Sequence, residues 1–269
     1  MSRPATTRVT ITIEDQIAQV RLNRADKLNA LDLDMFRAIA AAQKQVAKNR
    51  SLRAVVLGAK GSDFCSGLDV KSLMANRNGS VALLAKWLPW QANLAQKVST
   101  GWRRLQLPVI AAINGRCWGG GLQIALGADF RIVHPDASLS IMEGKWGLIP
   151  DMGGTLALRE LMQRDQAMRL AMTAEEFSAA RGLELGLVTD VSSSPWQDAM
   201  RLAQQLSERS PDAVAAVKRL YRKSWHGRAG AALARETGYQ LRIMMGANQH
   251  IALRRQRGED IEFRQPGRW

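Results

Sequence analysis

Apolar and polar residues alternate on both sides of a short polar turn near the start of the chain. In RVTITIEDQIAQVRLNR, apolar side chains recur at nearly every second position before and after the tripeptide EDQ. Such alternation places apolar side chains on one face of a strand, and a polar turn between two such runs is typical of a hairpin. The sequence therefore predicts a β-hairpin here.

The pattern then switches repeatedly between helical and strand-like spacing. It predicts a helix over 31–49, a buried strand over 52–60, and a helix over 80–106 that is interrupted at Pro89. A strand over 108–115, a helix opened by three glycines and two short strands within 130–141 follow. From Thr155 onward nearly all segments have helical spacing, and the last one is long and runs through Arg257.

Strands and helices thus alternate in the first part of the chain, and helices dominate the second. This order predicts an α/β core over 1–190 and a helical C-terminal region over 191–269. Serine followed by proline, at Ser194 and again at Ser210, predicts two helix starts with serine as N-cap and proline at the first helical position. No low-complexity linker separates the parts, so we expect the helical region to pack on the core or on a neighbouring subunit.

Length and composition favour a chain that folds without covalent or metal cross-links. The chain has 269 residues, of which 46% are hydrophobic, and its two cysteines, Cys65 and Cys117, lie far apart among apolar neighbours. We expect both to be buried, reduced thiols. None of the three histidines has a second ligand-type residue at metal spacing, so no metal site is predicted.

The N-terminus has no apolar signal segment, and no apolar run approaches the roughly 20 residues of a membrane helix. We therefore expect a cytoplasmic protein without a membrane segment. The net charge is +14, and residues 201–269 carry 14 Lys+Arg against 6 Asp+Glu. This balance suits a nucleic acid or a phosphate-rich cofactor, and equally a solvated basic surface with neither partner.

Two glycine-containing stretches suggest sites at which the backbone donates hydrogen bonds. They are FCSGLDVKSL, around Gly67, and WGGGLQIAL, which contains Gly119 to Gly121. Glycine lets the backbone approach a ligand closely, and a helix N-terminus adds its positive dipole end. Two such N–H groups converging on one oxygen would form an oxyanion hole. Taken alone, each motif is equally compatible with tight packing of a strand against a helix.

Four motifs in order carry a more specific signal: LNRADKLNAL, FCSGLDVK, PVIAAINGRCWGGGLQIALGADFRI and IMEGKWGLIPDMGGTLAL. Together they resemble the crotonase family, the enoyl-CoA hydratase and isomerase superfamily, from about Val9 to at least Val191. The resemblance implies a spiral of ββα units. It also implies C-terminal helices that assemble the subunits into a homotrimer or a dimer of trimers.

The resemblance also implies a coenzyme A thioester as substrate and no prosthetic group. The thioester carbonyl would be held by the backbone amides of Leu68 and Gly120, which would stabilise an enolate. Lys27 and Leu28 match the segment that lines the adenine, and Leu68 to Lys71 match the segment along the pantetheine and thioester. The full set of expected substrate contacts is Lys27, Leu28, Gly67, Leu68, Asp69, Val70, Lys71, Gly119, Gly120, Gln123 and Pro150.

The sequence departs from the hydratase pattern at Gln123. Hydratases that resemble this chain have a glutamate two residues after the glycines and a second at the position of Glu143. Hydration needs both carboxylates, one to activate water and one to supply a proton to carbon. An amide can orient water but cannot accept its proton, so two-carboxylate hydration is not expected here.

A further carboxylate, Asp151, follows Pro150 in IPDMGG. In this respect the chain is similar to dienoyl-CoA isomerases, which have an acid at the same position. They use it with the preceding glutamate to move a proton along the acyl chain. Those isomerases also have an acid at the position of Gln123, so the match is incomplete. Asp151 is alternatively an ordinary turn residue. We expect Glu143 and Asp151 to form the proton shuttle.

Three functions follow in order of preference. The first is an enoyl-CoA isomerase of dienoyl type, and the second is a hydratase or dehydratase that uses a single glutamate. The third is an RNA-binding protein of the same fold, which RRQRGEDIEFRQ disfavours because acids interrupt its arginines without aromatic stacking residues. Trp118 and Trp146 either shape an acyl pocket or pack as ordinary core aromatics.

Overall fold

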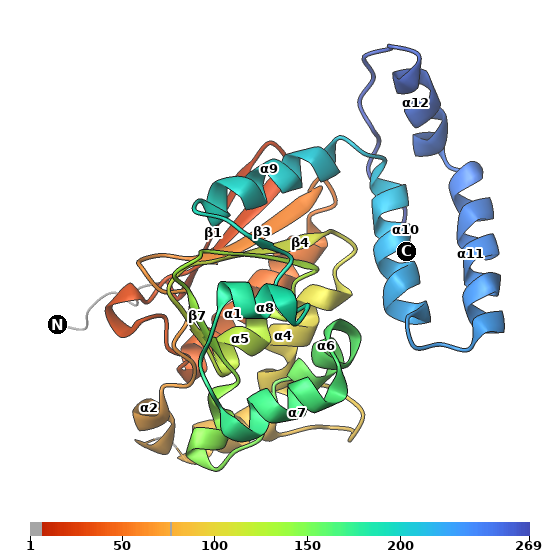
Figure 1. The fold of residues 1–269 in the computed structure, drawn as a ribbon. Coiled ribbons are helices and arrows are strands. Elements are labelled where there is room, and N and C mark those ends of the chain that lie inside the picture. Colours follow the sequence, from red (N-terminus) through yellow and green to blue (C-terminus); the bar gives the residue numbers. More distant parts are fainter. Residues whose placement is uncertain (1–6, 76) are drawn as a thin grey trace.

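The computed structural model describes residues 7–75 and 77–269, and within them strands and helices alternate before a helical C-terminal region (Figure 1). The strands are β1 (Val9–Glu14), β2 (Ile17–Leu22), β3 (Ala54–Ala59), β4 (Val109–Ile113), β5 (Arg116–Trp118), β6 (Phe130–Val133), β7 (Ser138–Ser140), β8 (Phe177–Ser178) and β9 (Asp190–Val191). The α-helices are α1 (Leu33–Lys48), α2 (Val70–Ala75), α3 (Arg77–Leu84), α4 (Leu94–Arg104), α5 (Gly120–Ala125), α6 (Gly154–Leu161), α7 (Arg164–Thr173), α8 (Ala179–Glu184), α9 (Pro195–Ser207), α10 (Pro211–Ser224), α11 (Ala229–Met244) and α12 (Ala247–Gln256). Two 3-10 helices, η1 (Ala25–Lys27) and η2 (Met142–Trp146), complete the set.

The larger sheet contains six strands in the order β1-β2-β3-β4-β6-β9. The first two form the predicted hairpin, with Val9 opposite Leu22, and the remaining neighbours are parallel. The turn residues Asp15 and Gln16 both have positive φ, as tight hairpin turns require. The alternation in the sequence therefore predicted this pairing correctly.

The smaller sheet has three strands in the order β5-β7-β8, of which β5 and β7 are parallel and β8 is antiparallel to β7. Strands β4 and β6 lie in the large sheet, and the strands that follow them, β5 and β7, pair with each other in the small one. This exchange between sheets is the arrangement expected of a ββα spiral. Strand β5 was not predicted, because three residues between two glycines are too short to show a periodicity.

The two faces of the large sheet bury different side chains. On one face the core includes Val20, Leu57 and Ile113 together with Cys65 and Cys117, which are both buried and free, as expected. On the other face a smaller cluster packs under α9. Figure 1 shows α9 lying across the strands of the large sheet. This helix therefore packs with the core, although its sequence falls in the predicted C-terminal region; the division at 190 stays a prediction.

Helices α10, α11 and α12 stand apart from the core in Figure 1 and pack on one another. A partly buried ion pair joins α10 to the core: Nζ of Lys218 lies 2.6 Å from Oδ2 of Asp129 and donates to the backbone oxygens of Trp102 and Leu107. The chain end returns toward the core, where Nε2 of Gln106 donates to the backbone oxygen of Trp269. The C-terminal helices are thus fixed to the core at specific polar contacts.

The helical predictions were right in kind but differ in extent. The segment predicted over 80–106 is interrupted around Pro89, as expected, but the break is wide: α3 ends at Leu84 and α4 begins only after its N-cap Asn93. The long last segment breaks at Gly246 into α11 and α12, and the part after Thr155 is mostly helical, as predicted, with the two short strands β8 and β9 in addition. Pro195 and Pro211 do occupy first-turn positions, although only Ser210 caps its helix through its side chain. In the described part of the chain, none of the helices is long and apolar enough to cross a membrane.

Candidate active site

The two glycine-containing stretches lie against each other in the fold. Gly67 has a φ of 94°, a conformation that other residues rarely adopt. A Cβ atom at this position would stand 3.1 Å from the backbone oxygen of Trp118 and 3.9 Å from the backbone nitrogen of Gly120. Glycine is therefore needed both for the turn and for the close approach of the second stretch.

Pairing with Leu31 determines the direction of the Leu68 N–H group. The backbone N–H of Leu31 donates to the carbonyl of Gly67, and the N–H of Asp69 donates to the carbonyl of Leu31. Because successive peptide groups of an extended chain point to opposite sides, the N–H of Leu68 points away from Leu31. On that other side the same segment pairs with β5, through Cys65.

The second stretch begins at Gly119, whose φ of 49° and ψ of −119° again favour glycine. Its N–H donates to the carbonyl of Ser140, and its carbonyl accepts from the N–H of Gln123. Among the described residues, neither the N–H of Leu68 nor that of Gly120 donates a hydrogen bond to another group. Two neighbouring backbone donors thus remain available, which supports the predicted oxyanion role.

Gln123, in α5, is almost fully buried and its amide orientation is determined by its neighbours. Oε1 of Gln123 accepts hydrogen bonds from the backbone N–H groups of Met152, at 2.9 Å, and Gly154, at 3.1 Å. Because an oxygen must face these two donors, the NH₂ group must face the other way. Nε2 of Gln123 donates a 2.6 Å hydrogen bond to Oε1 of Glu143. Gln123 therefore presents a donor, and no proton acceptor, to this carboxyl group.

Glu143 lies in η2 and is only 6% exposed. A Cβ atom on Gly119 would be 3.5 Å from Oε1 of Glu143, so this carboxyl group borders the glycine stretch. Burial raises the pKa of Glu143; hydrogen bonds from its own backbone and from Gln123 oppose this effect, and the charge of Asp151 adds to it. Oε2 of Glu143 is buried without a hydrogen-bond partner among the described residues. Oε2 is thus the carboxyl oxygen of Glu143 that the described residues leave without a hydrogen bond.

Asp151 supplies the second carboxyl group of the site. It is exposed to solvent, yet partial burial of its carboxyl raises the pKa of Asp151. Its charge adds a small increase to the pKa of Glu143, from which eight residues separate it in the chain. No described residue donates a side-chain hydrogen bond to Asp151. The carboxyl groups of Glu143 and Asp151 are thus coupled electrostatically, and the proton shuttle stays a prediction.

The residues expected to contact coenzyme A lie around the first glycine stretch. Lys27 ends η1 and is exposed, and Leu28 follows it in a left-handed conformation with 37% of its surface exposed. The carbonyl of Leu28 accepts from the N–H of Ser66, which joins this loop to the segment before α2. The structure thus brings the two predicted segments side by side. The remaining expected contacts are half-buried or exposed: Val70, Lys71 and Pro150.

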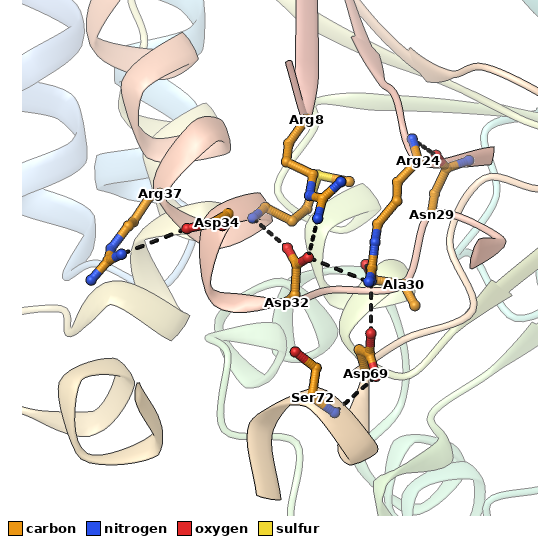
Figure 2. A network of polar contacts seen from close by, with 10 residues as sticks. Arg8, Arg24, Asn29, Ala30, Asp32, Asp34, Arg37, Asp69 and Ser72 are labelled. Carbon is orange, nitrogen blue, oxygen red and sulfur yellow. Dashed lines mark hydrogen bonds and ion pairs between the residues drawn. The ribbon is translucent and has the colours of Figure 1, made fainter. Parts of the chain in front are cut away.

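A polar network joins Arg24 to Asp32 and to Asp69, the residue that follows Leu68 in the chain (Figure 2). Arg24 donates through Nη1 to Oδ2 of Asp69, at 2.8 Å, and to the carbonyl of Ala30, at 3.0 Å. Its Nη2 lies 3.4 Å from Oδ2 of Asp32, which also accepts from Arg8 at 2.7 Å. The only signal for it in the sequence was that Arg24 lies within LNRADKLNAL and Asp69 within FCSGLDVK.

The two tryptophans near the site differ from each other. Trp118 is half-buried in β5, and its Nε1 donates to Oγ of Ser138 at 2.9 Å. Trp146 is 61% exposed, and the apolar side chains of Leu148 and Ile149, between it and Asp151, are exposed as well. Trp146 is therefore not a core aromatic, while Trp118 is held by a hydrogen bond of the fold.

Comparison with known proteins identifies the family of this chain. A sequence model of the enoyl-CoA hydratase/isomerase family matches residues 12–252, which is most of the chain. The chain belongs to the enoyl-CoA hydratase/isomerase family. It is therefore an enzyme of a family that acts on coenzyme A thioesters without a prosthetic group.

Relatives within the enoyl-CoA hydratase/isomerase family carry different activities. The chain is 30% identical over 219 residues to a peroxisomal Δ(3,5)-Δ(2,4)-dienoyl-CoA isomerase of Arabidopsis thaliana, covering 78% of this chain and 79% of that protein. It is 34% identical over 244 residues to a carnitinyl-CoA dehydratase of Salmonella paratyphi A, covering 89% and 87%. A crystal structure of an enoyl-CoA hydratase from Polaromonas sp. JS666 superimposes with a TM-score of 0.83 at 29% identity, covering 95% of this chain and 99% of that one.

Proposed function

We propose that this enzyme is an enoyl-CoA isomerase of dienoyl type. The observation that carries the proposal is the orientation of Gln123. Its amide donates to Glu143 and cannot accept a proton, whereas Oε2 of Glu143 is unpartnered and a second carboxyl group, Asp151, lies nearby. At this position a hydratase needs a carboxylate that accepts a proton from water, and an amide cannot do so, whereas removal and return of a proton needs only the carboxyl groups of Glu143 and Asp151.

In the proposed reaction the thioester oxygen accepts hydrogen bonds from the N–H groups of Leu68 and Gly120. One carboxylate removes a proton from the carbon next to the thioester, and the electron pair of that C–H bond enters the conjugated system as an enolate. The two N–H groups stabilise the negative charge on the oxygen, where each such donor typically contributes about 3–4 kcal/mol. The other carboxyl group returns a proton to the far end of the diene. Glu143 and Asp151 serve the two ends, and Gln123 only positions Glu143.

The name of the Arabidopsis relative supports an isomerase, since removal of a proton next to the thioester and its return at the far end of the diene convert a 3,5-diene into a 2,4-diene. A hydratase or dehydratase with Glu143 as its single acid is the alternative, and the 34% identity to a carnitinyl-CoA dehydratase favours it. In that case Gln123 would orient water or a hydroxyl group, and Asp151 would be a turn residue.

A panel of unsaturated acyl-CoA thioesters separates the two reactions. Isomerisation conserves mass and changes the ultraviolet absorption, whereas hydration adds one water to the mass. For an isomerase, Asp151→Asn should lower the rate by about 100-fold, the usual contribution of a positioned acid or base. Rapid hydration of a simple 2-enoyl-CoA that Asp151→Asn leaves unchanged would defeat the isomerase proposal.

We further propose that coenzyme A lies along Lys27, Leu28 and the segment from Gly67 to Lys71, and that the protein is a cytoplasmic homotrimer or dimer of trimers. Large apolar side chains exposed on α10, α11 and α12 support the assembly: Val217, Tyr221, Trp225, Leu233, Leu241, Met244, Met245 and Leu253. Light scattering at micromolar concentration tests it, and the mass of a single chain would contradict it.

A further inference from the structure

Arg24 is an arginine whose guanidinium is enclosed by the fold. Its backbone is fixed by the turn around η1, because its N–H donates to Oδ1 of Asn29 and its carbonyl accepts from the N–H groups of Lys27 and Asn29. Its side chain is 11% exposed and contacts three acceptors, the carbonyl of Ala30 and the carboxylates of Asp32 and Asp69. These contacts direct Arg24 inward, so it is not a surface cation free to bind a phosphate group.

Asp69 transmits this contact to the first backbone donor of the site. It directly follows Leu68, and its two carboxylate oxygens have different partners (Figure 2). Oδ2 accepts from Arg24 at 2.8 Å, and Oδ1 accepts from the backbone N–H of Ser72 at 3.1 Å, in the first turn of α2. Burial alone would raise the pKa of Asp69, but hydrogen bonds from Arg24 and Ser72 outweigh it and lower this pKa overall.

Leu68 is therefore held from two sides. Backbone pairing with Leu31 fixes the peptide groups before and after it, and Asp69 fixes the chain as it turns into α2. In an oxyanion hole each N–H donor must lie at hydrogen-bonding distance from the oxygen that becomes charged. Displacement of such a group by about 1 Å can reduce the rate by up to about 100-fold. The orientation of Asp69 thus bears directly on catalysis.

We propose that Arg24 is a positioning residue for the reaction: by holding Asp69 it keeps the N–H of Leu68 directed at the thioester oxygen. This inference rests on the proposed oxyanion role of Leu68. Arginine suits this position better than lysine, because two nitrogens of its planar fork face the carbonyl of Ala30 and both carboxylates, whereas lysine has a single nitrogen.

The test compares Arg24→Lys and Arg24→Gln with a matched control, Arg8→Lys. Arg8 donates to Asp32 in the same network but makes no hydrogen bond or ion pair to Asp69. Each variant is assayed for kcat and KM on the best substrate of the thioester panel. Each is also titrated with 4-(dimethylamino)cinnamoyl-CoA, whose absorption moves to longer wavelength when its thioester carbonyl is polarised by hydrogen bonds.

Both Arg24 variants should lose about 10-fold in kcat with KM nearly unchanged, and the bound chromophore should show a smaller red shift. Arg8→Lys should retain both kcat and the red shift, even where its melting temperature falls. Asp69→Asn, which keeps an acceptor for Ser72 but weakens the pair, should behave like the Arg24 variants. If Arg24→Gln does not fold, Asp69→Asn still tests whether the pair of Arg24 and Asp69 positions the N–H of Leu68.

Arg24 variants that retain kcat and the full red shift would overturn the inference while leaving the oxyanion hole intact. Equal losses in the Arg8 variant would also overturn it, because the effect would then come from general loss of stability. A wild-type protein that binds the chromophore without any red shift would instead refute the oxyanion role of Leu68 and Gly120 itself.

Discussion

The contact between Gln123 and Glu143 makes a quantitative prediction for Gln123→Glu. The substitution preserves the shape of the side chain, and its carboxylate can still accept from the N–H groups of Met152 and Gly154. It replaces the NH₂ group with an oxygen, however, so two carboxyl oxygens would stand where the 2.6 Å hydrogen bond now lies. The variant therefore changes the charge of this contact and little else.

Two charged carboxylates at this separation would repel each other by about 6 kcal/mol at an effective dielectric constant of about 20. Keeping one ordinary carboxyl group protonated at pH about 7.5 costs only about 4 kcal/mol, so the pair should bind one proton instead. The free energy of unfolding should then fall by up to about 4 kcal/mol at that pH. This is a large share of the roughly 5–15 kcal/mol typical of a domain, but the variant should still fold.

The sign of the pH dependence follows from the raised pKa of the pair. The loss of unfolding free energy in Gln123→Glu is absent below the ordinary carboxyl pKa. It grows as the pH rises, because the unfolded chain releases a proton that the folded pair of carboxyl groups retains. Above the pKa of Glu143 in the wild type, the two unfolding free energies should diverge by about 1.4 kcal/mol per pH unit.

Urea denaturation between pH 5 and pH 9 measures this divergence. The control is the exchanged pair, Gln123→Glu with Glu143→Gln, in which a carboxylate again faces an amide. Its stability should follow the wild type across the pH range. Parallel curves for the wild type and Gln123→Glu would refute the reasoning, because residue 123 would then not face Glu143.

Three further predictions follow from single contacts. Asp151→Asn should move the acid limb of the kcat/KM profile to lower pH, because the charge of Asp151 helps to raise the pKa of Glu143; an unmoved limb would contradict their coupling. Gly67→Ala should destabilise the protein by about 1–3 kcal/mol in thermal denaturation because of its φ of 94°, whereas Gly230→Ala, with no atom within 4 Å, should not destabilise it. Lys218→Met should cost about 3 kcal/mol in urea denaturation, because it leaves a partly buried carboxylate without its partner, and an unchanged midpoint would argue against this anchor.

Some features of this protein were determined by short stretches of sequence. The alternation around Asp15 and Gln16 predicted the β1–β2 hairpin, because strand period is a local property. The glycines marked two stretches of unusual backbone, and Gly67 and Gly119 do adopt the positive φ that glycine permits. The positions of Glu143 and Asp151 as candidate acids were also available, but only through resemblance to a family.

The tertiary structure alone decided how these pieces act together. The amide of Gln123 has one orientation only because Met152 and Gly154, about thirty residues later in the chain, present N–H groups to its oxygen. Likewise Arg24 and Asp69 are 45 residues apart and meet because Leu31 pairs with Leu68. Such contacts produce no periodicity in the sequence, since each depends on the packing of distant segments and not on the conformation of its own. The sequence therefore specified which groups are present, and the fold determined their direction, partners and pKa.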